Sequence, residues 1–335
     1  MLRFTCIALF AGLPVLWLAA ERELKGTPKL LEFSKHFPKP TLPADNELTE
    51  ERIALGERLF NDTILSIDGT VSCAACHVSD LAFSDDQRVS RGFEGRTGTR
   101  QSMPLFNLAW KSHFFWDGRK DRIRDQVLEP IQDHREMAAN LNNVIFRLTR
   151  RKGYQEEFKD TYGPGPVTAE KLSLALENYL LTLVSDQSKY DDAVAGKAKL
   201  SPEEERGKKL FFSKPSLGGA GCFQCHGGAT FTDYELRNNG IKHTEDLGRH
   251  RITGNDSDKG FFVTPSLRNI ELTAPYMHDG RFESLEEVIS HYNGPVHKSP
   301  TVDKALPAKG LGLPEQDQQA LLAFLKTLTD PRYNE

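Results

Sequence analysis

The sequence predicts an all-α fold, rich in loops and built from two similar halves in tandem. Three observations support this prediction. No stretch of alternating polar and apolar residues is long enough for a substantial β-sheet. A Cys-x-x-Cys-His motif occurs twice, and the segments around its two copies resemble each other. The chain of 335 residues is long enough for two units of ordinary size, each with its own core.

Both motifs have the pattern typical of covalent c-type haem attachment. Two residues between the cysteines let both thiols reach one macrocycle, and the next residue offers its imidazole to the iron. A zinc site or a thiol redox pair would share the Cys-x-x-Cys part, but two complete motifs favour two haem c cofactors. The motifs consist of Cys73, Cys76 and His77 in the first half and of Cys222, Cys225 and His226 in the second.

The internal repeat extends beyond the motifs and indicates how each half is built. Each half is expected to contain an opening helix, a haem motif, a loop-rich middle and a closing amphipathic helix. In both closing helices, leucines recur at i, i+4 and i+7 and therefore share one face. The matching segments are residues 48–60 and 200–211, residues 105–119 and 267–281, and residues 175–183 and 320–328.

The N-terminal residues 1–20 read as a secretory signal peptide, because Arg3 precedes an apolar run and charged residues follow it. An uncleaved membrane anchor is the alternative. Cys6 would leave with this peptide, so the four remaining cysteines all belong to haem motifs and none is left for a disulfide. The net charge of −4 argues against nucleic acid as a partner. The expected organisation continues with an extended, proline-containing lead segment at 21–46, a first domain at 47–196 and a second at 197–335.

These motifs and their repeat resemble known proteins. Each half resembles the class I cytochrome c fold, and residues 47–330 resemble the bacterial di-haem cytochrome c peroxidases and their MauG-like relatives. The resemblance implies a periplasmic enzyme whose two haems differ. The first would be peroxidatic and the second would transfer electrons.

The sixth ligand of each iron decides whether that haem can bind a reactant. Tyr292 shares a helix face with apolar residues, and it falls on the position of the family's second-haem ligand. Met277 is the rival ligand, although the repeat aligns it with Phe115, which suggests a packing position. In the first half the repeat places Pro130 where Tyr292 stands, and Phe93 falls where some peroxidases have a ligating histidine. The first haem is therefore expected to be five-coordinate, with His77 as its protein ligand.

The resemblance also implies roles for three residues of the first half. Glu136 falls on the glutamate that moves protons during peroxide cleavage, and His134 is a second candidate for that base. Gln126 falls on the glutamine that shapes the same pocket. Trp116 falls on the tryptophan between the two haems, where an indole could relay electrons, although a core tryptophan would look the same from sequence.

Family members bind a calcium ion through two backbone carbonyls and an asparagine side chain. Thr273 and Pro275 match the carbonyl positions, whereas Gln101 stands where the asparagine is expected. The expected partners are hydrogen peroxide and a small cytochrome c or cupredoxin as electron donor. The resemblance also allows for a homodimer.

The favoured function is thus a peroxidase that reduces hydrogen peroxide to water. A MauG-like oxidase that modifies a protein substrate is the first alternative. Tyr292 favours it, and Ala220 speaks against it because MauG has a surface tryptophan there. A di-haem electron carrier without a substrate is the second alternative, and it requires both irons to be six-coordinate.

Overall fold

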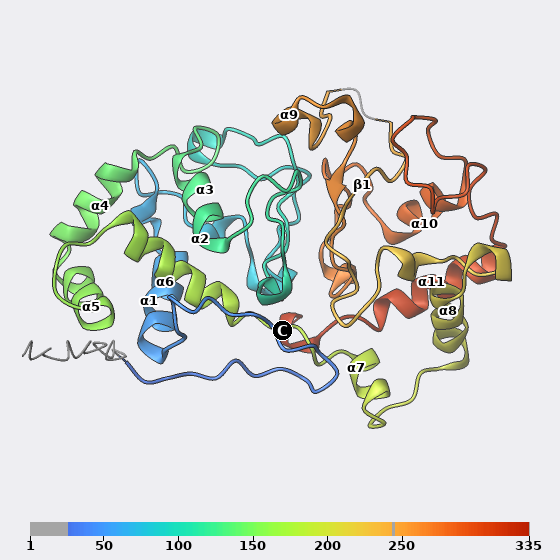
Figure 1. Cartoon of the computed structure of the whole chain (residues 1–335), viewed down its shortest axis with the longest axis horizontal. Coiled ribbons are helices and arrows are strands. Elements are labelled where there is room, and N and C mark those ends of the chain that lie inside the picture. Colours follow the sequence, from blue (N-terminus) through green and yellow to red (C-terminus); the bar gives the residue numbers. More distant parts are fainter. Residues whose placement is uncertain (1–25, 243–244, 335) are drawn as a thin grey trace, which may run out of the picture.

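The computed structural model describes residues 26–242 and 245–334. This part of the chain consists mostly of helices and loops, arranged as two halves side by side (Figure 1). Its only regular strands, β1 (Leu236–Arg237) and β2 (Phe262–Val263), pair antiparallel with Leu236 opposite Val263. The predicted predominance of helices and loops is confirmed. The α-helices are α1 (Glu50–Asn61), α2 (Ile123–Gln126), α3 (Leu128–Gln132), α4 (Leu141–Arg150), α5 (Lys152–Tyr162), α6 (Ala169–Leu181), α7 (Lys189–Val194), α8 (Pro202–Phe212), α9 (His250–Thr253), α10 (Leu285–Asn293) and α11 (Glu315–Lys326).

Two packed helices, α1 and α6, organise the first half. The Thr49 side chain caps α1 by accepting a hydrogen bond from the N–H of Arg52. Gly56 lies where the helices cross. A Cβ atom there would come within 2.1 Å of the carbonyl oxygen of Ala175 in α6, so a side chain would force the helices apart. The leucines at this crossing are fully buried and belong to one hydrophobic core that also includes residues of α4 and α5.

Helices α8 and α11 form the equivalent pair in the second half. Ser201 and Glu204 make a capping box at the start of α8. A Cβ atom at Gly207 would lie 1.9 Å from the carbonyl oxygen of Ala320 in α11. In both halves the crossing glycine stands three residues before a Leu-Phe pair, and it faces an alanine of the closing helix. A second, separate hydrophobic core surrounds this pair.

The loop-rich middles of the two halves also share backbone conformations. Asn107 and its counterpart Asn269 are left-handed, with φ of 56° and 55°. Phe115 and its counterpart Met277 likewise have positive φ values of 64° and 74°. Since non-glycine residues rarely adopt such angles, matching pairs indicate that the repeat preserves the loop geometry as well as the residues.

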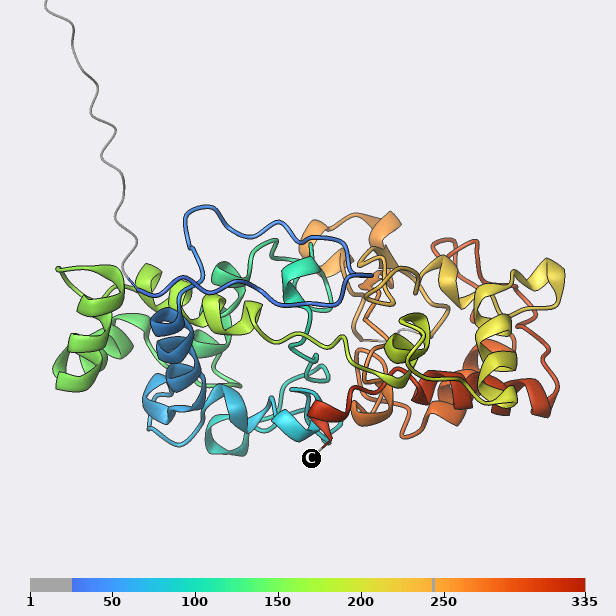
Figure 2. The ribbon, with the colours of Figure 1, turned by 90° about the horizontal axis from the view of Figure 1, so that it is seen from below.

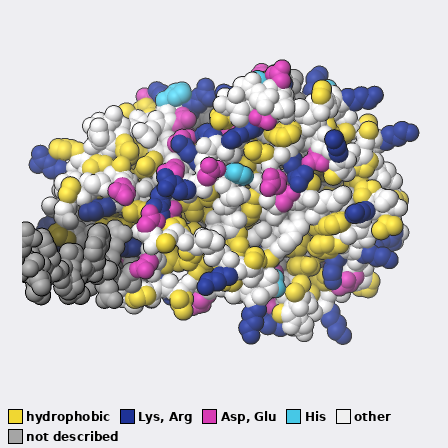
Figure 3. All heavy atoms as spheres, in the orientation of Figure 1, with side chains coloured by type: hydrophobic (Ala, Val, Ile, Leu, Met, Phe, Trp, Pro, Cys, Tyr) yellow, Lys and Arg dark blue, Asp and Glu magenta, His cyan; other side chains and the backbone are white. Residues whose placement is uncertain are grey.

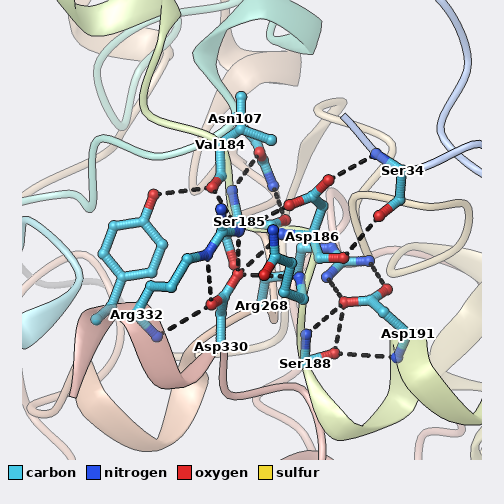
Figure 4. Close-up of polar contacts among 12 residues, drawn as sticks. Ser34, Asn107, Val184, Ser185, Asp186, Ser188, Asp191, Arg268, Asp330 and Arg332 are labelled. Carbon is cyan, nitrogen blue, oxygen red and sulfur yellow. Dashed lines mark hydrogen bonds and ion pairs between the residues drawn. The ribbon is translucent and has the colours of Figure 1, made fainter. Parts of the chain in front are cut away.

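Buried polar contacts join the two halves at a seam (Figure 4). The Arg268 side chain, which is 0% exposed, donates to both carboxylate oxygens of Asp191 over 2.8 and 2.7 Å. Asp330 accepts a hydrogen bond from the backbone N–H of Asp186, and Arg332 pairs with both of these aspartates. Each buried charge at this seam therefore has a partner, as a stable interface requires.

Both ends of the described chain cross this seam. The segment before α1 runs along the first half as far as the seam and returns (Figure 2). There Ser34 donates to the carbonyl oxygen of Asp186 over 3.0 Å. Near the C-terminus, the Tyr333 hydroxyl donates to the carbonyl oxygen of Val184 over 3.0 Å. The Tyr333 ring packs 6.0 Å from that of Phe83, so the end of the chain completes the core of the first half.

The expected signal peptide at residues 1–20 lies outside the described residues. Within 26–242 and 245–334, none of the helices combines the length and the apolar character that a membrane crossing needs.

Candidate functional site

Two adjoining cavities are lined by most of the residues that the sequence singled out. The first cavity lies in the first half and the second cavity in the second half. The predicted site residues around the first cavity are Cys73, Cys76, His77, Gln101, Trp116, Gln126, Pro130 and Glu136. Those around the second cavity are Gln101, Trp116, Cys222, Cys225, His226, Thr273, Pro275, Met277 and Tyr292.

A short turn presents the first motif to its cavity. Residues Cys73–Ala75 form a single 3-10 turn, and the N–H of His77 donates to the carbonyl oxygen of Cys73 over 3.1 Å. The imidazole Nδ1 of His77 donates to the carbonyl oxygen of Phe83 over 2.8 Å. This bond leaves the lone pair on Nε2, where a metal can bind. Burial lowers the pKa of His77 and keeps the ring neutral, as metal binding requires.

The second motif repeats this arrangement. The N–H of His226 donates to the carbonyl oxygen of Cys222 over 2.8 Å, and Nδ1 of His226 donates to the carbonyl oxygen of Pro265 over 3.1 Å. Burial lowers the pKa of His226 to about 4. Each motif thus offers two thiols and one neutral imidazole with a free Nε2 to the cavity of its own half. This donor set fits a covalently attached haem c in each cavity.

Glu136 lies in the loop after α3, and its side chain reaches the first cavity. Although the Glu136 side chain is exposed to the cavity, the surrounding protein reduces the hydration of its carboxyl group. That desolvation, with repulsion from Asp133, raises the pKa of Glu136 to about 7, against a smaller opposing effect of Arg119. A carboxyl with such a pKa can both accept and return a proton near neutral pH.

A glycine allows the Glu136 loop to reach the cavity. The backbone at Gly92 packs so closely that a Cβ atom would lie 2.2 Å from the carbonyl oxygen of Arg135 and 2.4 Å from that of Glu136. The next residue, Phe93, donates its N–H to the carbonyl oxygen of Glu136 over 2.7 Å. The loop of residues 91–96 therefore holds the carboxyl-bearing loop in place.

The other first-half candidates separate into two groups. Gln126, at the end of α2, and Pro130, in α3, line the first cavity. Phe93 and His134 are not among the lining residues. The His134 side chain is 73% exposed. Of the two candidate bases, only Glu136 lines the first cavity.

Trp116 belongs to the wall between the two cavities, since it lines both of them together with Gln101 and Pro104. The Trp116 side chain is buried, and its indole N–H donates to the carbonyl oxygen of Gln101 over 2.8 Å. Its own carbonyl oxygen accepts a hydrogen bond from the N–H of Val263 in the second half. The indole is thus held by a residue of the first half, and the backbone of Trp116 is bonded to the second half.

Both candidate ligands for the second iron reach the second cavity. Burial raises the pKa of Tyr292, in α10, to about 12, while a hydrogen bond with Asn239 acts in the opposite direction. The Asn239 side-chain nitrogen also lies 3.3 Å from the Met277 sulfur. Asn239 thus contacts both candidates, which brings Tyr292 and Met277 to one region of the wall.

The three residues expected at a calcium site also border the second cavity. Gln101 donates its side-chain N–H to the Ser84 hydroxyl over 2.9 Å, which leaves its side-chain oxygen as an acceptor. In the described residues no group of three or more His, Cys, Asp or Glu side chains could hold a metal ion. A calcium ion here would therefore depend on the carbonyl oxygens of Thr273 and Pro275.

Sequence reasoning missed three residues at these cavities. Gly92, Asn239 and Lys111 are not part of either haem motif, and no local pattern distinguishes them. Gly92 and Asn239 contact residues far along the chain, and Lys111 lines the first cavity. A glycine fifteen residues after the nearest motif gives no signal until its packing against residues 135–136 is seen.

Comparisons with known proteins agree with this arrangement. The profile of the di-haem cytochrome c peroxidase family matches residues 50–199. The chain is 37% identical over 290 residues to the methylamine utilization protein MauG of Methylorubrum extorquens, covering 85% of this chain and 80% of that protein. It is 31% identical over 303 residues to the cytochrome c551 peroxidase of Nitrosomonas europaea, covering 87% and 82%.

The solved structure of a MauG-like protein associated with microbial copper homeostasis superimposes with a TM-score of 0.82 at 30% identity. The match covers 91% of this chain and 98% of that one. The resemblance recognised in the motifs is thereby confirmed. The chain belongs to the family of di-haem cytochrome c peroxidases and MauG proteins, which are oxidoreductases with two haem c groups.

Proposed function

We propose that this protein is a periplasmic peroxidase that reduces hydrogen peroxide to water with electrons from a small redox protein. The observation that carries the proposal is that His77 and Glu136 line one cavity, and that Trp116 in its wall also lines the second cavity. The overall change is H2O2 + 2 H⁺ + 2 e⁻ → 2 H2O. Haem, when bound, supplies the electron transfer and the site at which the O–O bond breaks.

Two domains of the class I cytochrome c type, at 47–196 and 197–335, would carry this function. The separate hydrophobic cores and the repeated helix pairs α1–α6 and α8–α11 support this division. The first domain would hold the peroxidatic haem and the second the electron-transfer haem. Pro130 lines the first cavity and offers no donor to a metal, which supports an iron there that would be held by His77 without a second protein ligand.

Glu136 would manage the protons. As a carboxylate it accepts one proton from hydrogen peroxide, and as a carboxylic acid it returns that proton to the oxygen that leaves as water. Its pKa of about 7 matches both tasks. The Gln126 amide, on the same cavity, would orient the peroxide through hydrogen bonds.

Trp116 would be the route for electrons between the two cavities, since its indole is buried in their common wall. In the second domain, His226 and Tyr292 would hold the iron, with Met277 as the alternative to Tyr292. Tyrosinate is an accepted haem ligand, and binding to iron would lower the tyrosine pKa.

A calcium ion held by Thr273, Pro275 and Gln101 would support the region between the domains.

Electrons would enter at the second motif from a small cytochrome c or a cupredoxin. Leu217 and Phe212 are 78% and 40% exposed, and Phe212 packs 6.3 Å from Phe223 within that motif. Lysine and arginine side chains project along the outer edge of this half (Figure 3). Such a surface suits transient contact with an acidic protein.

A signal peptide at residues 1–20 would direct the protein to the periplasm.

Steady-state turnover tests the proposal. Purified di-haem protein is mixed with hydrogen peroxide and a reduced small cytochrome c, and donor oxidation is followed optically. The proposal expects peroxide-dependent oxidation that the Glu136→Gln variant loses and a His134→Gln variant keeps. Absence of turnover with every reduced cytochrome c and cupredoxin offered would contradict it.

A MauG-like oxidase is the second candidate, and Tyr292 favours it, because an anionic oxygen ligand stabilises higher oxidation states of iron. Ala220, 7% exposed, occupies the position of the surface tryptophan implied by the resemblance to MauG, so this chain lacks that exit for a radical. Negligible peroxide turnover combined with long-lived oxidised haems would favour the oxidase. Two six-coordinate haems unreactive toward peroxide would instead indicate an electron carrier.

A further inference from the structure

Lys111 is a cation in the first cavity without an anionic partner. It follows the short helical turn of residues 108–110, and its partly buried side chain lines the cavity. The Lys111 ammonium nitrogen lies 3.8 Å from the Met103 sulfur and 5.7 Å from the centre of the Phe114 ring. No carboxylate among residues 26–242 and 245–334 forms an ion pair with it.

Two arginines of the same cavity have carboxylate partners. Arg100 pairs with Asp117 and Asp246 over 2.6 Å each, and Arg119 pairs with Asp117 and Glu129. For Lys111, in contrast, the removal of water is the only influence on its acidity, and it lowers the pKa of the ammonium group to about 8. Because charges withdrawn from water are normally paired, Lys111 is suited to bind an anion in this cavity.

The position of Lys111 indicates which part of the cofactor would supply that anion. Its contact residue Met103 follows Ser102, whose hydroxyl lies 3.3 Å from Nδ1 of His77. Lys111 and His77 line the same cavity, which would hold the haem. A haem macrocycle joined to Cys73 and Cys76 also carries two propionate carboxylates at its edge. These are the anions that a haem would bring into the cavity.

We propose that Lys111 binds a propionate of the haem attached at Cys73 and Cys76. The ammonium group donates charge-assisted hydrogen bonds to the carboxylate, which replace the water that both groups lose. A cation at this place favours the reduced form of the iron, because it offsets the negative charge of the propionate. Lys111 is thus a positioning residue for the first haem. The inference depends on haem being present at the first motif, but it does not depend on which reaction that haem performs.

The test is a spectroelectrochemical titration of the purified di-haem protein and three variants. Lys111→Met removes the charge while keeping a similar length, Lys111→Arg keeps the charge, and Lys152→Met removes an 88% exposed lysine of α5 as a control. Lys111→Met is expected to lower the equilibrium constant for reduction of the first haem about tenfold, which corresponds to about 59 mV for one electron. The second haem is the internal reference and should not change.

Lys111→Arg should restore the potential of the first haem, and Lys152→Met should leave both potentials unchanged. Resonance Raman bands of the propionate bending modes should shift in Lys111→Met alone. Unchanged potentials and unchanged propionate bands in Lys111→Met would overturn the inference. A change in iron spin state in both Lys111→Met and Lys111→Arg would also overturn it, since Lys111 would then be an iron ligand. If the protein carries two haems but shows no peroxide turnover, the proposed reaction is refuted. The reduction potentials of the Lys111 variants would still decide the role of Lys111.

Discussion

Trp116 donates its indole N–H to the carbonyl oxygen of Gln101 over 2.8 Å, and both residues line both cavities. This hydrogen bond fixes the plane of the only tryptophan among the residues that surround the cavities. Electron transfer depends on such a fixed path between two redox groups. The relationship therefore links the fold, in which the halves share a wall, to the proposed exchange of electrons through that wall.

Replacing Trp116 by Phe should slow electron exchange between the haems while leaving peroxide binding intact. The phenylalanine ring preserves much of the packing but removes the indole, which is more easily oxidised, and its N–H. Rapid mixing of the reduced protein with peroxide would measure the oxidation rate of the second haem. Trp110→Phe is a matched control, because Trp110 lies outside both cavities and bonds to Pro38. Equal rates in the wild type and Trp116→Phe would refute the relay.

The pH dependence of the reaction with peroxide should follow Glu136. Desolvation raises its pKa from 4.5 to about 7, so the carboxylate that accepts a proton is populated only as the pH rises through that value. The rate constant should increase about tenfold per pH unit below the pKa and become constant above it. Glu136→Gln should lower the rate by about 100-fold or more and abolish this dependence. A wild-type profile retained in Glu136→Gln would assign the base to another group.

Gly92→Ala should impair the reaction without touching a reactive group. Its methyl group would meet the carbonyl oxygens of Arg135 and Glu136 at 2.2 and 2.4 Å, so the loop carrying the carboxyl must move. Gly98→Ala is the matched control on the same segment, because the nearest atom to its Cβ is 3.9 Å away. We expect a large loss of peroxide reactivity in Gly92→Ala at normal haem content and nearly none in Gly98→Ala. Similar activity in both variants would show that the loop position is unimportant.

Tyr333 should stabilise the first half from the far end of the chain. Tyr333→Ala removes a buried ring that packs on Phe83 and Phe106, and it should lower the free energy of unfolding by about 3–5 kcal/mol. Tyr333→Phe removes only the hydrogen bond to Val184 and should cost about 1 kcal/mol. Chemical denaturation followed by far-ultraviolet circular dichroism measures both. Because the carbonyl of Phe83 accepts the hydrogen bond from His77, Tyr333→Ala should also shift the spectrum of the first haem.

Individual spectra of two variants should identify the ligand of the second iron. Tyr292→Phe should change the absorption and EPR spectrum of the second haem and leave the first unaffected. Met277→Leu keeps the volume and should leave both spectra unchanged. The reverse pattern would assign the ligand to Met277, whose sulfur lies 3.3 Å from the Asn239 side chain that Tyr292 also contacts.

The parts of the site that depend on local sequence were predictable. Each Cys-x-x-Cys-His motif contains its own turn, and the helix with Tyr292 has its capping residues Ser284 and Glu287 within one turn. The repeat also anticipated the helix pairs, because the Leu-Phe segments and the closing helices carry their own apolar faces. Glu136 and Trp116 were found only through resemblance, since one glutamate or tryptophan looks like any other in a single sequence.

The remaining features depend on tertiary contacts. Gly92 matters because of a backbone more than forty residues away, and Asn239 because two candidate ligands converge on it. Lys111 stands out only once its surroundings are known to contain no carboxylate partner. The ion pair of Arg268 with Asp191 likewise joins residues of different halves. No periodicity or spacing reports such contacts, because they arise when the whole chain has folded.

The central claim is that the iron at His77 is open to peroxide while the iron at His226 is closed. EPR spectroscopy of the fully oxidised protein, before and after one equivalent of hydrogen peroxide, tests it most directly. The account predicts one high-spin and one low-spin ferric signal, with the high-spin signal lost on adding peroxide. Two low-spin signals that peroxide leaves unchanged would contradict it.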